Sequence, residues 1–247
     1  ARDLDRLRQI AALLGRLAPP DFAVSLDGNE SFKSVAAFRA EWEAVRADPA
    51  LRPLCERLLF VEQPFHRDLA LSGEVGRALR DWPERPPFII DESDAEPASL
   101  PAALRLGYAG TSHKNCKGVF KGVANACLLA HLRCANPARR LILSGEDLSN
   151  IGPVALLQDL AVQAALGVTS IERNGHHYFS GLSFWPAEIQ APMLAQHGDL
   201  YERAAAGWPA LRIADGQISL RSVNAAPFGI ATIPPLMAAL FDSSNPA

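Results

Sequence analysis

LLFVEQPF, residues 58–65, is an apolar run that ends on a carboxylate, Glu62, two residues before a proline. A helical pattern follows over residues 67–79. The run does not alternate apolar and polar residues, which is typical of a parallel strand buried on both faces. The stretch therefore predicts a buried strand with an acidic residue at its carboxyl end.

The same order of apolar run, acidic or polar end and helix recurs on both sides of this stretch. FAVSL (22–26) ends at Asp27 ahead of a helix expected over 34–47, and PFII (87–90) ends at Asp91 ahead of one over 98–104. Further strands are expected at 105–112, 140–144 and 168–171, and further helices at 118–133 and 153–166. Strands that alternate with helices predict an α/β protein.

No glycine-rich phosphate loop follows any of these strands, which disfavours an open nucleotide-binding sheet. In a (β/α) barrel of TIM type the chemistry lies at the face where the strands end. Acidic strand ends would then meet on one face, so the pattern favours a barrel, with six strands present.

The composition is that of a soluble globular chain. Its 247 residues are 49% apolar and 21% charged, enough for one large domain with a core. The net charge of -3 does not suggest a nucleic-acid partner, and no apolar run is long enough for a membrane span. The amphipathic N-terminal stretch carries charges unlike a signal peptide, and the four cysteines form no CxxC pair. We therefore expect a cytoplasmic protein with reduced thiols, and Cys127 and Cys134 packed in the core.

Three carboxylates close three consecutive predicted strands. Glu62 lies 35 residues after Asp27 and 29 residues before Asp91, each close to one strand-helix unit. On adjacent barrel strands such carboxylates would repel one another unless a cation neutralised them. Oxygen ligands without clustered cysteine or histidine favour Mg²⁺ over Zn²⁺. The alternative for each acid is that it caps the following helix or pairs with an arginine.

The strand ends SLDGNE, VEQPF and IIDES resemble the three metal-ligand strand ends of the enolase superfamily, in its mandelate racemase and muconate-lactonizing enzyme branch. LRIADGQISL (211–220) resembles the segment that returns to the capping domain in that family. The resemblance implies a modified (β/α)7β barrel over 1–210, present from its third to its eighth strand. It also implies that 211–247 returns toward a capping domain. The capping domain and first two strands are expected to be absent or to lie outside this chain.

The resemblance further implies that Asp27, Glu62 and Asp91 each give an oxygen to one Mg²⁺, with Glu92 as the alternative third ligand. The metal would hold a small-molecule carboxylate substrate and stabilise the enediolate formed when its α-proton leaves. The outcome would be racemisation, epimerisation, dehydration or cycloisomerisation, so the expected enzyme is an isomerase or lyase. Members of the family are often dimeric or octameric, so a homo-oligomer is compatible with the resemblance.

The family places a base at the end of the sixth barrel strand, where this chain reads GYAGTSHKNCKG (107–118). Lys114 is the expected base, and Lys117, His113 and Thr111 are alternatives in other alignments. The structural alternative for Lys117 is a solvated helix face. The family's Lys-x-Lys pair does not precede Asp27, so the second acid/base role is left unassigned.

The remaining candidates lie at other strand ends. His176 and His177 follow the last strand and are expected as an acid or as substrate contacts, because histidine titrates near neutrality. The alternative for this pair is one packed and one exposed side chain.

Asn29, Glu146 and Asp147 are expected to bind substrate. The alternative for Glu146 and Asp147 is a cap at the start of the following helix.

Two other functions are compatible with these residues. One is a metal-dependent barrel lyase or aldolase from another lineage. The other is a non-catalytic family relative that binds metal and a carboxylate ligand but lacks one acid/base lysine. Exchange of the substrate α-proton in D₂O would separate an enzyme from a binder.

Overall fold

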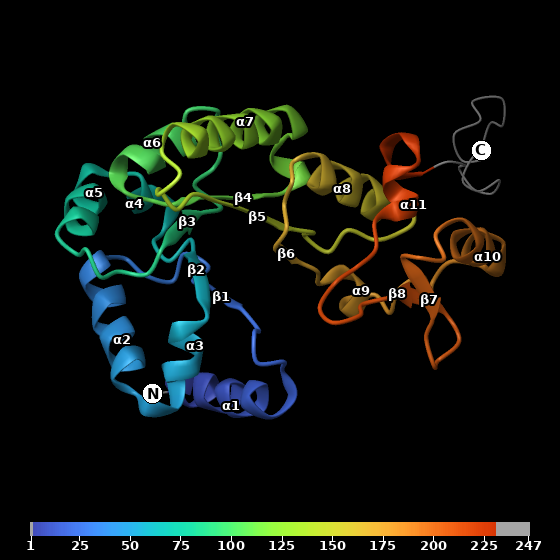
Figure 1. Ribbon diagram of the computed structural model, residues 1–247, viewed down its shortest axis with the longest axis horizontal. Coiled ribbons are helices and arrows are strands. Elements are labelled where there is room, and N and C mark those ends of the chain that lie inside the picture. Colours follow the sequence, from blue (N-terminus) through green and yellow to red (C-terminus); the bar gives the residue numbers. More distant parts are fainter. Residues whose placement is uncertain (1, 231–247) are drawn as a thin grey trace. The chain divides into compact units, whose positions relative to one another are not determined.

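The computed structural model describes residues 2–230, without the side chains of His176, His177 and Pro227. The chain is α/β, and its main sheet has six strands in the order β1-β2-β3-β4-β5-β6 (Figure 1). The strands are β1 (Val24–Asp27), β2 (Leu58–Glu62), β3 (Phe88–Ile90), β4 (Gly110–His113), β5 (Ile142–Glu146) and β6 (Ile171–Glu172). The β1–β2, β2–β3, β3–β4 and β5–β6 pairs are parallel, so each of these pairs places its carboxyl ends at one edge.

The chain divides into two compact units. Unit 1 comprises residues 1–112 and 127–143, and unit 2 comprises residues 113–126 and 144–247. Strands β4 and β5 and helix α7 (Val119–Ala135) therefore contribute residues to both units.

Seven helical segments of unit 1 precede α7. They are α1 (Arg2–Leu17), α2 (Val35–Ala47), the 3₁₀ turn η1 (Pro49–Leu51), α3 (Arg52–Glu56), α4 (Arg67–Ala70), α5 (Gly73–Arg80) and α6 (Ser99–Leu106). Ser34 begins α2 by accepting a hydrogen bond from the Ala37 amide at 3.1 Å, and Ser72 does the same for α5 through Val75. Such caps satisfy amide groups that have no partner inside the helix.

The core of unit 1 is rich in aromatic rings. Phe38 of α2 lies 5.1 Å from Phe32, 5.2 Å from Phe88 and 6.0 Å from Phe65, measured between ring centroids. Aliphatic residues of α5 and α6 complete this cluster against β2 and β3 (Figure 1). Packing helices against one face in this way fixes where β2 and β3 end, and hence where their acidic residues lie.

A second, smaller cluster of unit 1 joins α6 to the later part of α7. Leu100 and Leu104 of α6 pack with Leu129 of α7 and with Leu141. Cys127 and Cys134 do not belong to it, and both are exposed, so the prediction that they lie in the core is wrong. The buried positions of α7 are Gly122, Asn125 and Leu129, which follow helical spacing and leave both cysteines on the other side.

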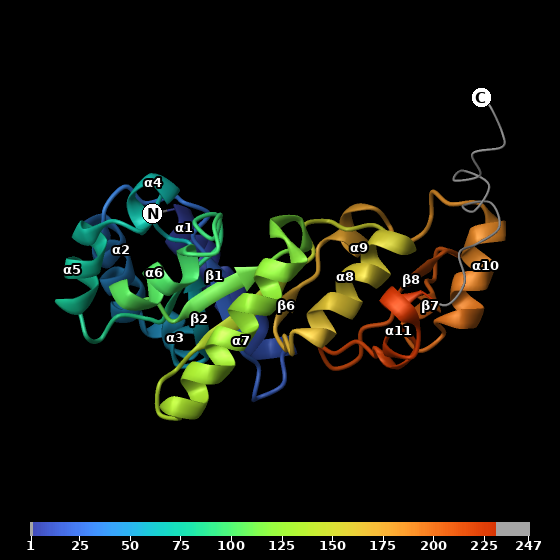
Figure 2. The ribbon, with the colours of Figure 1, turned by 90° about the horizontal axis from the view of Figure 1, so that it is seen from above.

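Unit 2 has its own core around α8 (Val154–Ala165). Leu156, Leu157 and Leu160 pack with Met193 of α10 (Ala187–Gln196) and with residues of an antiparallel pair. That pair is β7 (Tyr201–Arg203) with β8 (Pro209–Leu211), and α8, α10 and α11 gather around it in Figure 2. The remaining helical segments of the described residues are the 3₁₀ turn η2 (Asn115–Lys117), α9 (Gly175–Tyr178), α11 (Arg221–Asn224) and η3 (Pro227–Gly229).

The predicted α/β class is confirmed, and an observed strand overlaps each of the six predicted ones. Two predicted bounds are wrong, since residues 105 and 106 belong to α6 and β6 overlaps its prediction at Ile171 alone. The helix expected over 67–79 is two helices, because Ser72 caps a new one. Strand β8 spans the boundary expected at residue 210, whereas the observed units divide elsewhere. Residues 231–247 of the expected C-terminal segment lie outside the described residues.

Candidate metal centre

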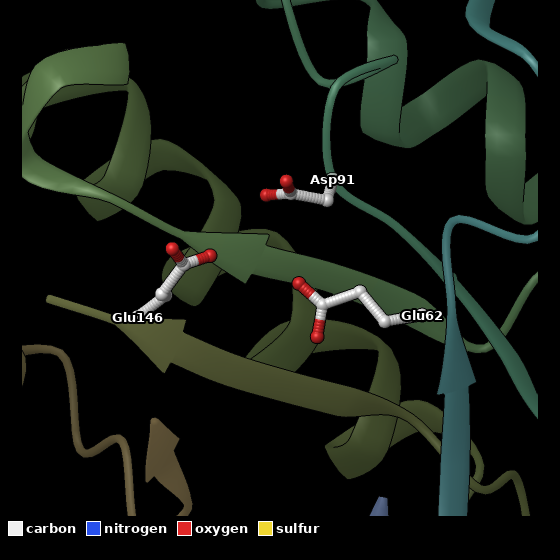
Figure 3. Close-up of side chains that lie close together, drawn as sticks. All are labelled: Glu62, Asp91 and Glu146. Atoms are coloured by element: carbon white, nitrogen blue, oxygen red, sulfur yellow. The ribbon is translucent and has the colours of Figure 1, made fainter. Parts of the chain in front are cut away.

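Glu62 and Asp91 lie at the ends of neighbouring strands in unit 1. Glu62 is the last residue of β2 and pairs with Ile89 of β3, while Asp91 directly follows β3. Both are buried, with 8% and 3% of their surface exposed, and a carboxylate oxygen of each lies within 4.8 Å of the other. Figure 3 shows both side chains extending to the same side of the strands that carry them. The predicted meeting of these two acids is confirmed.

Gln63, for which no role was predicted, connects these two strand ends through hydrogen bonds. Its side-chain oxygen accepts hydrogen bonds from the amides of Asp91 (2.8 Å) and Ser93 (3.3 Å). Its side-chain nitrogen donates to the Phe65 carbonyl (2.7 Å) and to Ser93 Oγ (2.8 Å). Both hydrogens and both lone pairs of the amide are thus used within a side chain that is 1% exposed. The hydrogen bonds with Asp91 and Ser93 join residues that are far apart in the sequence. The only sequence signal for them is that VEQP and DES lie at the ends of consecutive predicted strands.

Asp27 ends β1 beside Glu62, its partner in the strand register. It is exposed, and its two oxygens accept hydrogen bonds from the amide and the side-chain nitrogen of Asn29, both at 2.8 Å. Asn29, expected as a substrate contact, therefore holds the Asp27 carboxylate in the described structure. The turn is close to β2, since a Cβ on Gly28 would lie 2.5 Å from Pro64 Cα.

In unit 2, Lys114 and Glu146 form an ion pair. Lys114 Nζ lies 2.6 Å from Glu146 Oε2, and their side chains are only 12% and 17% exposed. The residue expected as base and a residue expected to bind substrate are therefore in direct contact. Among the described residues, Asp27 does not belong to the group of close potential metal ligands that contains Glu62 and Asp91.

The alternative bases near Lys114 have structural partners. Thr111 is fully buried and donates to the Ile90 carbonyl at 3.1 Å. His113 Nε2 lies 3.0 Å from Asn115 Oδ1. The His113 ring packs against Gly122, where an added Cβ would lie 2.5 Å from the ring atoms. Lys117 is half-buried, as is Glu92, the alternative third metal ligand. Among these candidate bases, Lys114 is the one whose described contact is with an acidic side chain, that of Glu146.

Asp147 is fully buried in a polar network of unit 2. It accepts hydrogen bonds from the amides of Ser149 (2.9 Å) and Gly175 (3.1 Å), and it lies 3.8 Å from Nη1 of Arg173. Arg173 also pairs with Asp159. Burial raises the pKa of Asp159 to about 6, against the attraction of Arg173, and burial lowers the pKa of Arg173. These contacts anchor the loop after β5, and neither Glu146 nor Asp147 caps α8, which has no side-chain cap.

His176 and His177 belong to helix α9, but their side chains lie outside the described part of the structure. Their expected roles therefore stay predictions.

Two comparisons with known proteins give no assignment. No protein-family model matches the sequence, and no curated protein matches it. Within residues 2–230, no helix has both the length and the apolar character needed to cross a membrane.

The chemistry of the carboxylate pair favours a hard cation. Two carboxylates about this far apart repel by about 3 kcal/mol at the effective dielectric constant of about 20 that describes protein sites. A divalent cation replaces this repulsion by attraction, and oxygen-only ligands suit Mg²⁺ or Ca²⁺. The donor set at the ends of β2 and β3 therefore fits a bound Mg²⁺.

Proposed function

We propose that this chain is a Mg²⁺-dependent enzyme that removes the α-proton of a small carboxylate substrate. The observation that carries the proposal is the pair of buried carboxylates, Glu62 and Asp91, at the carboxyl ends of adjacent parallel strands. Active sites of TIM-type barrels lie at this edge. The six-strand sheet is compatible with part of such a barrel, and the motifs SLDGNE, VEQPF and IIDES point to the enolase superfamily.

The proposed roles follow from the chemistry of each side chain. Glu62 and Asp91 hold the cation, and Asp27, the partner of Glu62 in the strand register, is the proposed third ligand. A bound Mg²⁺ would bind the substrate carboxylate and stabilise the negative charge that develops when the α-proton leaves. In its neutral amine form Lys114 accepts that proton, and Glu146, 2.6 Å away, orients the amine by accepting its hydrogen bond. Returning the proton gives an isomerase, and loss of a β-substituent gives a lyase.

Metal binding is tested first, by calorimetry and by the Mg²⁺-induced rise in melting temperature. Glu62→Gln and Asp91→Asn should each weaken Mg²⁺ binding at least about tenfold, because each removes a charged ligand. Glu172→Gln is the matched control, since Glu172 also ends a parallel strand and is exposed. Equal affinity in all variants would contradict the proposed ligands.

The third ligand is tested with Asp27→Asn in the same assay. A loss of Mg²⁺ affinity in this variant supports the set Asp27, Glu62 and Asp91. If the variant binds Mg²⁺ as the unchanged protein does, this three-carboxylate set is excluded.

Proton abstraction is tested by incubating 2-hydroxy and 2-amino carboxylates with the protein and Mg²⁺ in D₂O. Deuterium should enter the α-carbon, and EDTA or Lys114→Met should reduce the exchange at least about a thousandfold. Mg²⁺ binding without exchange in any such acid would favour a non-catalytic carboxylate binder.

A further inference from the structure

A polar pocket lies in unit 1, at the opposite ends of the strands from Glu62 and Asp91. Its volume is about 350 Å³, and it is lined by the segments that lead into β3, β4 and β5. Three arginines, Arg85, Arg139 and Arg140, line it, and no acidic residue does. The walls therefore carry three positive charges in a chain whose net charge is -3.

Backbone carbonyls hold the three guanidinium groups in place. Arg85 donates to the carbonyls of Trp82 (3.1 Å) and Gly107 (2.9 Å). Arg139 donates to Leu104 at 3.2 Å, and Arg140 donates to Leu59 at 2.6 Å. These four bonds use a minority of the fifteen or so N–H groups that three arginines carry.

The positive charge of the pocket is not balanced by carboxylates. Across residues 2–230, none of the three arginines forms an ion pair with an acidic side chain. Arg85 is half-buried, and burial lowers its pKa. A guanidinium withdrawn from water without a counter-charge is costly, and a bound anion would offset that cost.

An apolar surface also lines the pocket. Tyr108 and Pro86 are buried and line it together with Pro87. The Tyr108 hydroxyl donates to the Ala70 carbonyl at 2.8 Å, so it is not directed to a ligand. The pocket therefore combines fixed guanidinium groups with a small apolar surface.

We propose that this pocket binds a small multivalent oxyanion of the phosphate class. The planar fork of arginine matches phosphate oxygens, and three such forks favour a ligand with more than one negative charge. The apolar surface would contact the organic part of a phosphate ester. The site is independent of the proposed metal centre, because its residues precede the strands that the carboxylates follow.

The test is calorimetric titration of the full chain with pyrophosphate, in EDTA and at about 0.15 M salt, where weak surface attraction is screened. One saturable site is expected, and Arg139→Gln and Arg140→Gln should each raise its dissociation constant about tenfold. Pyrophosphate should also raise the melting temperature of the unchanged protein but not that of the double variant.

Arg133→Gln is the matched control, because Arg133 also donates to a backbone carbonyl, that of Leu141 at 3.1 Å, but does not line the pocket. It should bind pyrophosphate as the unchanged protein does. A citrate titration distinguishes phosphate from carboxylate ligands, and tighter citrate binding would overturn the phosphate assignment. No saturable binding up to about 5 mM, or equal loss in Arg133→Gln, would overturn the site itself. Glu62→Gln should leave this binding unchanged, which separates the result from the proposed metal function.

Discussion

Gln63 is the residue on which the geometry of the carboxylate pair most directly depends. Replacing it by alanine leaves the Asp91 and Ser93 amides and the Phe65 carbonyl without their partner in a buried place. We expect Gln63→Ala to lower the free energy of unfolding by about 3 kcal/mol and to weaken Mg²⁺ binding, since both strand ends lose their common tie. Urea unfolding and calorimetry measure the two effects.

Gln190→Ala is a suitable comparison for that variant. Gln190 is half-buried and makes one side-chain hydrogen bond, to the Trp185 carbonyl at 2.6 Å. Its loss should cost about 1 kcal/mol and leave Mg²⁺ binding unchanged. If Gln63→Ala were as stable as Gln190→Ala, the hydrogen bonds of the Gln63 side chain would contribute little to the stability of the fold.

Asp159 gives a prediction about pH. Its pKa is raised from 3.8 to about 6 in the folded state by burial, so the folded protein binds a proton there that the unfolded chain has lost. This contribution to stability is complete below about pH 4 and is lost as the pH rises through about 6. Between about pH 4 and 7, the free energy of unfolding of the unchanged protein should therefore fall by up to about 3 kcal/mol relative to that of Asp159→Asn. Urea unfolding of both proteins across this range measures it, and a constant difference would contradict the raised pKa.

At the scale of elements, the sheet depends on a close approach between β4 and β5. A Cβ on Gly110 would lie 1.7 Å from the Ile142 carbonyl oxygen, which is backbone and cannot move aside cheaply. We expect Gly110→Ala to lower the free energy of unfolding by about 3 kcal/mol or more, because the strands must separate to admit the methyl group. Thermal and urea unfolding measure this loss.

Gly15→Ala serves as the control for that substitution. Nothing lies within 4 Å of a Cβ at Gly15, which is inside helix α1. Alanine there should be neutral or should stabilise by about 0.5–1 kcal/mol through its helix propensity. If both variants lost equal stability, the contact at Gly110 would not be the cause.

Whether an element could be predicted from the sequence depended on the kind of element. Runs such as LLFV and PFII predict buried strands because every side chain is apolar, whichever face of the sheet it lies on. Strands β7 and β8 were missed, because three-residue segments containing Glu202, Arg203 and Pro209 carry no such signal. The break between α4 and α5 was missed because Leu69, Leu71, Val75 and Leu79 continue an apolar pattern across it.

At the scale of the whole molecule, the proposed metal centre makes a prediction about unit 1, to which both Glu62 and Asp91 belong. If these residues bind one ion, Mg²⁺ should slow amide hydrogen exchange in α6 of this unit. Hydrogen-exchange mass spectrometry measures this helix in the whole chain.

The variant Glu62→Gln is the comparison for this experiment. It should remove the Mg²⁺-dependent protection of α6, because it removes a charged ligand. If Mg²⁺ protects α6 equally in both proteins, Glu62 is not a ligand of the ion.

The sequence by itself determined the α/β class, the approximate places of six strands and the acidic residues at the ends of most of them, because apolar runs and their boundaries are local properties of the chain. It also singled out Lys114 and Glu146 separately. Only the tertiary structure decided which of these groups meet: Glu62 with Asp91, Lys114 with Glu146, and Asp27 with Asn29. Likewise, only folding places Gln63 against Ser93 and gathers Arg85, Arg139 and Arg140 around one pocket. Hydrogen bonds and charge pairs act over a few ångströms in space, and distance along the sequence does not report that separation.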